Sequence, residues 1–224
     1  RYSSDYFIVM DGPAHSSNKP TLTFGCRGIA VASITTFGPR TPLHSGHYGN
    51  YAPNPVFDLA NLLSSMKDEH GRVLVKDYYE GIEITPEISY VLGSVPFDSI
   101  AFKKSIGIHS SEDVGHDYQE SLQYPSLNVR QIGTSWTGDG LKTVIPAYAT
   151  ANIDVRLVPE TDGYLQMEKI RQHIEDQGYY VIDRDPTEEE RTSYSKIVKF
   201  EPSRAVNAFR TNPDLEFGKK IRSN

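Results

Sequence analysis

The segment from Ala147 to Leu157 alternates between apolar and polar side chains, and this pattern constrains the fold more than any other feature. Side chains of a strand point alternately to its two faces, so a period of two predicts a strand with one buried and one polar face. Such a strand requires a layered fold in which other elements cover its apolar face. The apolar residues are Ala149, Ala151, Ile153, Val155 and Leu157, and the polar ones are Thr150, Asn152, Asp154 and Arg156.

Two helices are expected to provide that cover. Asn54 followed by Pro55 favours a helix start, because asparagine caps free amides and proline suits the first helical turn. Helical spacing of the apolar residues that follow predicts a helix over residues 55–68, and a second helix is expected over residues 162–177. The apolar residues of the first helix are Val56, Leu59, Ala60, Leu63 and Met66.

Short apolar segments predict the remaining strands: Tyr6–Met10, Cys26–Phe37, Leu127–Ile132, Tyr179–Ile182 and Lys196–Phe200. From Cys26 onward the order is strand, helix, strand, strand, helix, strand, which is the order of a ferredoxin-like fold. We therefore expect an α+β, ferredoxin-like two-layer sandwich, with an antiparallel four-stranded sheet and two helices on one face. Thr85, Asp98 and the segment 115–124 indicate short helices in the middle of the chain.

Composition excludes several classes of protein. Hydrophobic residues form 38% and charged residues 23% of the 224 residues, which is typical of a globular domain, and no apolar run is long enough to span a membrane. A net charge of -6 argues against a nucleic-acid partner, since phosphate binding requires clustered Lys and Arg. The single cysteine, Cys26, excludes an intrachain disulfide and a multi-cysteine zinc site; it fits a reducing, cytoplasmic location.

Three positions suggest metal chemistry. His44 and His47 lie three residues apart in a glycine-rich loop, and imidazole suits zinc, but on the residues alone ordinary loop histidines are the favoured interpretation. Asp11 follows an apolar segment, where an aspartate is either a ligand or a turn former. No HExxH or CxxC motif accompanies them.

Arg156 and Thr143 are candidates for substrate binding. Arg156 lies on the polar face of the alternating strand, where its planar guanidinium can bind a carboxylate through paired hydrogen bonds, or form an ion pair with Asp154 or Glu160. Thr143 on its own indicates no particular function. The segment 133–137, GTSWT, lacks the final glycine of a serine-hydrolase elbow and leads into a strand, so that mechanism is rejected.

Four segments, taken in order, resemble one enzyme family, the carnosinase-like branch of the di-zinc exopeptidases. They are DYFIVMDG at residues 5–12, KPTLTFGCRG at 19–28, LHSGHYGNYAPNP at 43–55 and GLKTVIPAYATANIDVRLVP at 140–159. The resemblance implies that Asp11 is a zinc ligand and that His44 reaches across a dimer to stabilise the oxyanion in the partner's active site. It also implies that Thr143 and Arg156 contact the C-terminal side of the substrate, with Arg156 pairing its carboxylate. His47 matches no catalytic position.

The sequence also departs from the family. The early His-x-Asp and the late histidine of the family's metal site have no counterpart here, and no Glu-Glu pair precedes Asp11. The adjacent glutamates at residues 188–190 lie far towards the C-terminus, in an expected surface loop, and cannot replace that pair. We therefore expect a remnant of the catalytic domain at residues 1–25, the lid and dimerisation domain at 26–200, and a return segment at 201–224.

This division implies a function for the parent rather than for these residues alone. The parent is expected to be a homodimeric metallo-exopeptidase acting on peptides or acyl-amino acids with two zinc ions, or with manganese or cobalt. The fragment alone is expected to be inactive and to bind no metal. The alternative is a non-catalytic ferredoxin-like domain for oligomerisation or ligand binding in a pseudoenzyme.

Overall fold

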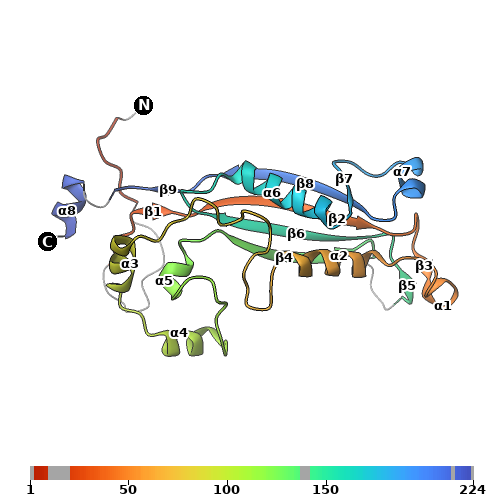
Figure 1. Cartoon of the computed structure of the whole chain (residues 1–224), viewed down its shortest axis with the longest axis horizontal. Coiled ribbons are helices and arrows are strands. Elements are labelled where there is room, and N and C mark those ends of the chain that lie inside the picture. The colour runs from red at the N-terminus through yellow and green to blue at the C-terminus, as the bar shows by residue number, and fades with distance from the viewer. Residues whose placement is uncertain (1–2, 10–20, 137–141, 213–214, 223–224) are drawn as a thin grey trace.

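A five-stranded sheet lies along the long axis of the molecule (Figure 1). The computed structural model describes residues 3–9, 21–136, 142–212 and 215–222. The strands lie in the order β4 (Ser126–Thr134), β6 (Tyr148–Leu157), β2 (Gly28–Phe37), β8 (Ile197–Val206) and β7 (Tyr180–Ile182). The alternating segment is therefore β6, next to the edge strand β4, and its apolar residues are buried as predicted.

The sheet differs from the predicted four-stranded antiparallel sheet. β4, β6, β2 and β8 pair antiparallel, but a fifth strand, β7, pairs parallel with β8. The chain leaves β7, passes through α7 (Glu188–Ser193) and returns in the same direction as β8. A crossover of this kind is what a parallel pair requires. Both segments were predicted as strands, but the ferredoxin-like order has only one strand after the second helix and therefore accommodates only one of them.

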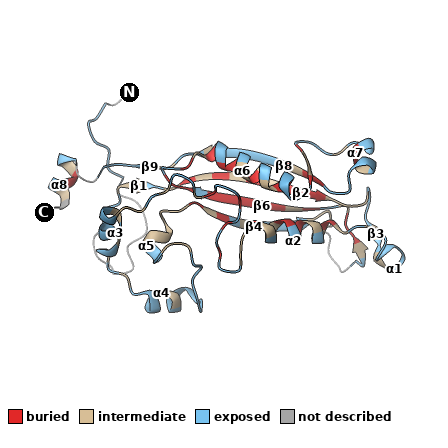
Figure 2. Cartoon of the chain, in the orientation of Figure 1, coloured by how far each residue is buried: buried red, intermediate tan, exposed pale blue. Residues whose placement is uncertain are grey.

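Two helices cover the same face of the sheet, as predicted. α2 (Pro55–Ser65) packs on β6 and β2, and α6 (Gly163–Asp176) packs on β2 and β8 (Figure 2). The Asn54 side chain accepts a hydrogen bond from the amide of Val56, which confirms the predicted cap. Asp162 caps α6 in the same way.

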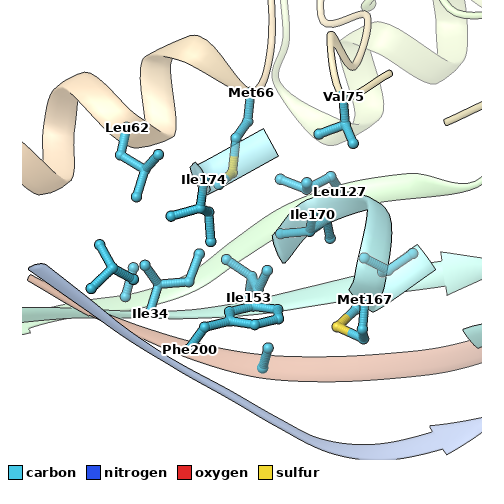
Figure 3. Packing of buried hydrophobic residues seen from close by; sticks show 14 of the residues in the cluster. Ile34, Leu62, Met66, Val75, Leu127, Ile153, Met167, Ile170, Ile174 and Phe200 are labelled. Carbon is cyan, nitrogen blue, oxygen red and sulfur yellow. The ribbon is translucent and has the colours of Figure 1, made fainter. Parts of the chain in front are cut away.

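The core lies between these helices and the sheet (Figure 3). Residues of successive strands and helices interlock there, and each large buried aliphatic side chain contributes about 1.5–3 kcal/mol to folding. The labelled residues of this core are Ile34, Leu62, Met66, Val75, Leu127, Ile153, Met167, Ile170, Ile174 and Phe200.

The opposite face of the sheet is polar, and its side chains pair across the strands. Ser33 donates to Asn152 (2.6 Å), and Asn128 donates to Asp154 (3.0 Å). This face therefore remains free of covering helices without leaving those groups unpaired.

Short elements extend the two ends of the sheet. At one end β1 (Gly25–Cys26) pairs with β9 (Phe209–Arg210), near α8 (Glu216–Arg222). At the other end β3 (Leu43–His44) pairs with β5 (Val144–Ile145), next to α1 (Ser45–Tyr48). Between α2 and β4 lie the three short helices that the sequence indicates: α3 (Pro86–Gly93), α4 (Ser99–Ile106) and α5 (Tyr118–Ser121).

The predicted buried strand at Tyr6–Met10 is wrong for its described part. Tyr6–Val9 form no strand and are exposed, with Phe7 86% exposed. An apolar run becomes a strand only where a neighbour pairs with its backbone, and no strand pairs with it among residues 3–9, 21–136, 142–212 and 215–222. None of the described helices is long and apolar enough to cross a membrane.

Candidate functional site

His44 is exposed at the point where β3 ends and α1 begins. Its Nδ1 accepts a hydrogen bond from the amide of Gly46, with a distance of 3.0 Å. A ring nitrogen that accepts a hydrogen bond carries no proton, so the proton of the neutral ring lies on Nε2. His44 therefore presents an N–H donor to the outside of the molecule, which is the group that an oxyanion requires.

Thr143 lies directly beside His44, although 98 positions separate Thr143 from Ser45 in sequence. The amide of Ser45 donates to the carbonyl of Thr143 (2.9 Å), and β3 pairs with β5 immediately after it. Thr143 is exposed. The structure thus brings together two of the predicted site residues at one end of the sheet.

His47 lies near His44, with ring centroids 5.0 Å apart and planes tilted by 37°. Two imidazoles alone do not make a metal site, because zinc sites in proteins use three or four protein ligands. Within the described ranges, no group of three or more His, Cys, Asp or Glu side chains is placed to hold a metal ion. Those residues do not fit a di-zinc site, and Asp11, the predicted ligand, lies outside the described residues.

Arg156 occupies the polar face near the far end of β6, as predicted. Its Nε lies 3.8 Å from a carboxylate oxygen of the buried Asp154, and half of its side chain is exposed. Arg130 lies at the same distance from the other oxygen of Asp154, so this carboxylate is shared. Glu160 pairs instead with Arg210 at 3.1 Å. Because Asp154 is shared with Arg130 and lies 3.8 Å from Arg156, the exposed guanidinium of Arg156 can bind a second carboxylate.

Arg27 is a residue near Arg156 that the sequence analysis did not single out. Its Nη2 donates to the carbonyl of Tyr124 (2.6 Å), whereas its buried Nε has no hydrogen-bond partner among the described residues. Burial, and next the positive charge of Arg156, lower the pKa of Arg27. The segment GCRG does not indicate that Arg27 lies near Arg156, because this proximity depends on the pairing of β2 with β6.

His44 and Arg156 lie at opposite ends of the five-stranded sheet. β5 and the His44 loop adjoin the start of β6, while Arg156 is near its end. At about 3.4 Å per residue, Arg156 lies roughly 27 Å along the strand from Tyr148. One dipeptide-sized ligand cannot contact both residues within a single chain.

Comparisons with known proteins agree with this architecture. The chain matches the family described as "Peptidase dimerisation domain" (M20_dimer) over residues 24–180. It is 29% identical over 174 residues to the Cys-Gly metallodipeptidase dug1 of Schizosaccharomyces pombe, a match that covers 76% of this chain and 37% of that protein. It is 30% identical over 177 residues to the Beta-Ala-His dipeptidase of Rattus norvegicus, covering 76% and 35%.

Solved structures show the same fold. Human carnosine dipeptidase 1 superposes with a TM-score of 0.71 at 24% identity, covering 87% of this chain and 40% of that one. The dipeptidase Dug1p of Saccharomyces cerevisiae gives 0.73 at 22% identity, covering 92% and 41%. The chain thus spans well under half the length of these relatives. Because the family match extends over most of its length, the chain belongs to the M20 peptidase dimerisation-domain family.

Proposed function

We propose that this chain is the lid and dimerisation domain of a metal-dependent dipeptidase-like hydrolase, and that it contributes His44, Thr143 and Arg156 to catalysis. The observation that carries this proposal is the separation of His44 and Thr143 from Arg156 along β6. In a homodimer with two-fold symmetry, each substrate site can receive Arg156 from one lid and His44 with Thr143 from the other lid. The two-fold axis makes the two sites equivalent, so the same arrangement occurs at both.

Each residue has a chemical task that its geometry supports. The Nε2–H of His44 donates to the oxyanion that forms when a peptide carbonyl is attacked, and a donor of this kind contributes about 10²–10³-fold to kcat. Arg156 binds the terminal carboxylate of the substrate through charge-assisted hydrogen bonds. Thr143 contacts the substrate beside His44.

The metal ions belong to the remainder of the proposed enzyme. Two zinc ions are the cofactors we infer, with manganese or cobalt as substitutes, and Asp11 is the ligand proposed from this chain. The described residues offer no group of three or more His, Cys, Asp or Glu side chains for a metal ion, which agrees with ligands supplied mainly by the rest of the enzyme. Peptides or acyl-amino acids are the proposed substrates, and the single, exposed Cys26 agrees with a cytoplasmic location.

The surface formed by α2 and β4 is the proposed dimer interface. β4 is an edge strand, so one side of its backbone can pair with a second copy. α2 packs on the adjacent strand β6, and Phe57 projects from it with 70% of its surface exposed. Two β4 edges related by a two-fold axis would continue the sheet across the dimer, with the two α2 helices side by side.

Subunit mixing in the intact protein tests this arrangement. His44→Ala and Arg156→Ala homodimers should each lose dipeptide hydrolysis by about 100-fold or more, because each lacks one component of both sites. After 1:1 subunit exchange, half of the dimers are hybrids with one complete site, so activity should recover to about one quarter of wild type.

A matched control distinguishes the two ends of the lid. His44→Ala and Thr143→Ala affect the same end, so their hybrid contains no complete site and should remain inactive. Recovery in this control, or none in the first mixture, would overturn the cross-dimer assignment. Intact protein that dimerises yet hydrolyses no dipeptide in the presence of divalent metals would favour the non-catalytic alternative.

A further inference from the structure

Helix α7 lies at the same end of the sheet as β3, α1 and β5, and β3 carries His44 (Figure 1). It follows β7 and therefore lies beyond residue 180, where the match to the dimerisation-domain family ends. The proposed function assigns no role to α7.

Arg191 of α7 contacts the point where the chain leaves β2 and enters the loop that leads to His44. Its Nη1 donates to the carbonyl of Gly38 (3.3 Å), and its guanidinium lies 5.3 Å above the ring of Phe37. A second contact joins Arg40 of the loop to Glu188 of α7 through an ion pair. Both contacts come from one short helix and act on one side of the loop.

The other side of the same loop is fixed by close packing. The amide of Gly38 donates to the carbonyl of Ala147 (2.9 Å). A Cβ added at Gly38 would lie 2.6 Å from Cδ of Pro55 and 3.0 Å from the carbonyl oxygen of Pro146. Gly38 therefore contacts the start of α2, the segment before β6 and Arg191.

Several side-chain contacts hold the start and the end of α7 in place. The carboxylate of Glu190 accepts two hydrogen bonds from Arg184, both at 2.8 Å, and one from the amide of Thr187 at 2.7 Å. These bonds hold the pKa of the Glu190 carboxyl at about 2. Tyr194, at the end of α7, stacks on Tyr180 of β7 with ring centroids 3.7 Å apart.

We propose that α7 positions His44 for catalysis, with Arg191 as the positioning residue, an inference that rests on the proposed function. Among the described residues, the loop is also held by the two-residue pairing of β3 with β5 and by the bonds of Ser45 to Thr143. A donor must lie within a narrow range of distance and angle to stabilise an oxyanion, so movement of the loop lowers kcat. Substrate binding by Arg156, at the far end of the lid, is unaffected.

The test uses the intact, metal-loaded enzyme and a dipeptide substrate. Arg191→Met should lower kcat about 10- to 100-fold, the effect of a displacement of about 1 Å, and should leave KM within about 2-fold. Hydrogen exchange at the Ser45 amide should become faster, since its bond to Thr143 closes the loop. Arg171→Met is the control, because it removes a comparable arginine, which pairs with Glu175 on α6. This variant should change neither kcat nor the exchange rate of the Ser45 amide.

A double-mutant cycle shows whether Arg191 acts through His44. In the His44→Ala background, Arg191→Met should cause no further loss of kcat, because the group that it positions is gone. Additive losses, or an unchanged kcat for Arg191→Met beside a strong His44→Ala effect, would refute the positioning role and leave the proposed function intact. An unchanged kcat for His44→Ala would instead refute the role that the proposed function gives to His44.

Arg191→Lys provides a second, milder variant. Lysine keeps a positive charge near Phe37 but cannot reproduce the planar fork of arginine, so partial rescue is expected, with kcat about 2- to 5-fold below wild type. If Arg191→Met fails to fold, this variant decides: an unchanged kcat together with unchanged exchange at Ser45 would overturn the proposal.

Discussion

At the scale of single residues, His173 shows how a local environment couples stability to pH. Its Nε2 lies 2.9 Å from Oγ of Ser65, and this contact joins α6 to α2. Desolvation by burial lowers the pKa of His173 below its ordinary value of 6.5, with Asp176 partly opposing the shift. The folded state therefore favours the neutral ring, while the unfolded chain takes up a proton near pH 6.5.

The sign of this linkage gives a prediction. The contribution of His173 to stability is complete above about pH 6.5 and is lost as the pH falls through that value towards the lower pKa of the folded state. His173→Gln should therefore reduce the difference between the free energies of unfolding at pH 7.5 and pH 5.5, measured by urea denaturation. Equal differences for wild type and variant would contradict this assignment.

At the scale of elements, the starts of the helices follow local chemistry that is visible in the sequence. Asn54, Asp162, Thr85 and Asp98 each cap the helix that follows them, because the interaction involves only the next two or three amides. β7 and β8 show the opposite case. Their strand character was predictable, but their parallel pairing depends on α7 and on the position of β2.

The cap of α2 can be tested directly. Asn54→Ala removes the bond to the Val56 amide and should destabilise the chain by about 1 kcal/mol in urea unfolding. Asn61→Ala provides a control on the same helix, at an exposed interior position where alanine is the better helix former. A loss for Asn61→Ala as large as that for Asn54→Ala would show that the cap is not the cause.

At the scale of the whole molecule, the length of the sheet separates the two proposed halves of the site. His44 and Thr143 occupy one end of the sheet and Arg156 the other, so the proposed site requires two copies of the chain. Under the proposed function, association through α2 and β4 is therefore required for activity.

Phe57→Glu tests that surface. Two glutamates near a two-fold axis lose apolar contact and repel each other, so the dimer dissociation constant should rise about 10-fold or more, which corresponds to about 1.4 kcal/mol. Sedimentation equilibrium of the intact protein measures it. Leu165→Glu is the control, because Leu165 is 62% exposed on α6, away from the proposed interface. Equal weakening by both variants would argue against α2 as the interface.

The sequence by itself determined what depends on neighbours in the chain. The alternation in β6, the caps of α2 and α6, and the short motifs that carry His44, Thr143 and Arg156 are all local, so their type and order could be predicted. Only the tertiary structure decided which of these residues meet. Pairing of β3 with β5 brings Thr143 to His44, and the length of β6 keeps Arg156 away from them. The contact of α7 with Gly38 arises in the same way, because 153 positions separate Arg191 from Gly38 and only folding closes that distance.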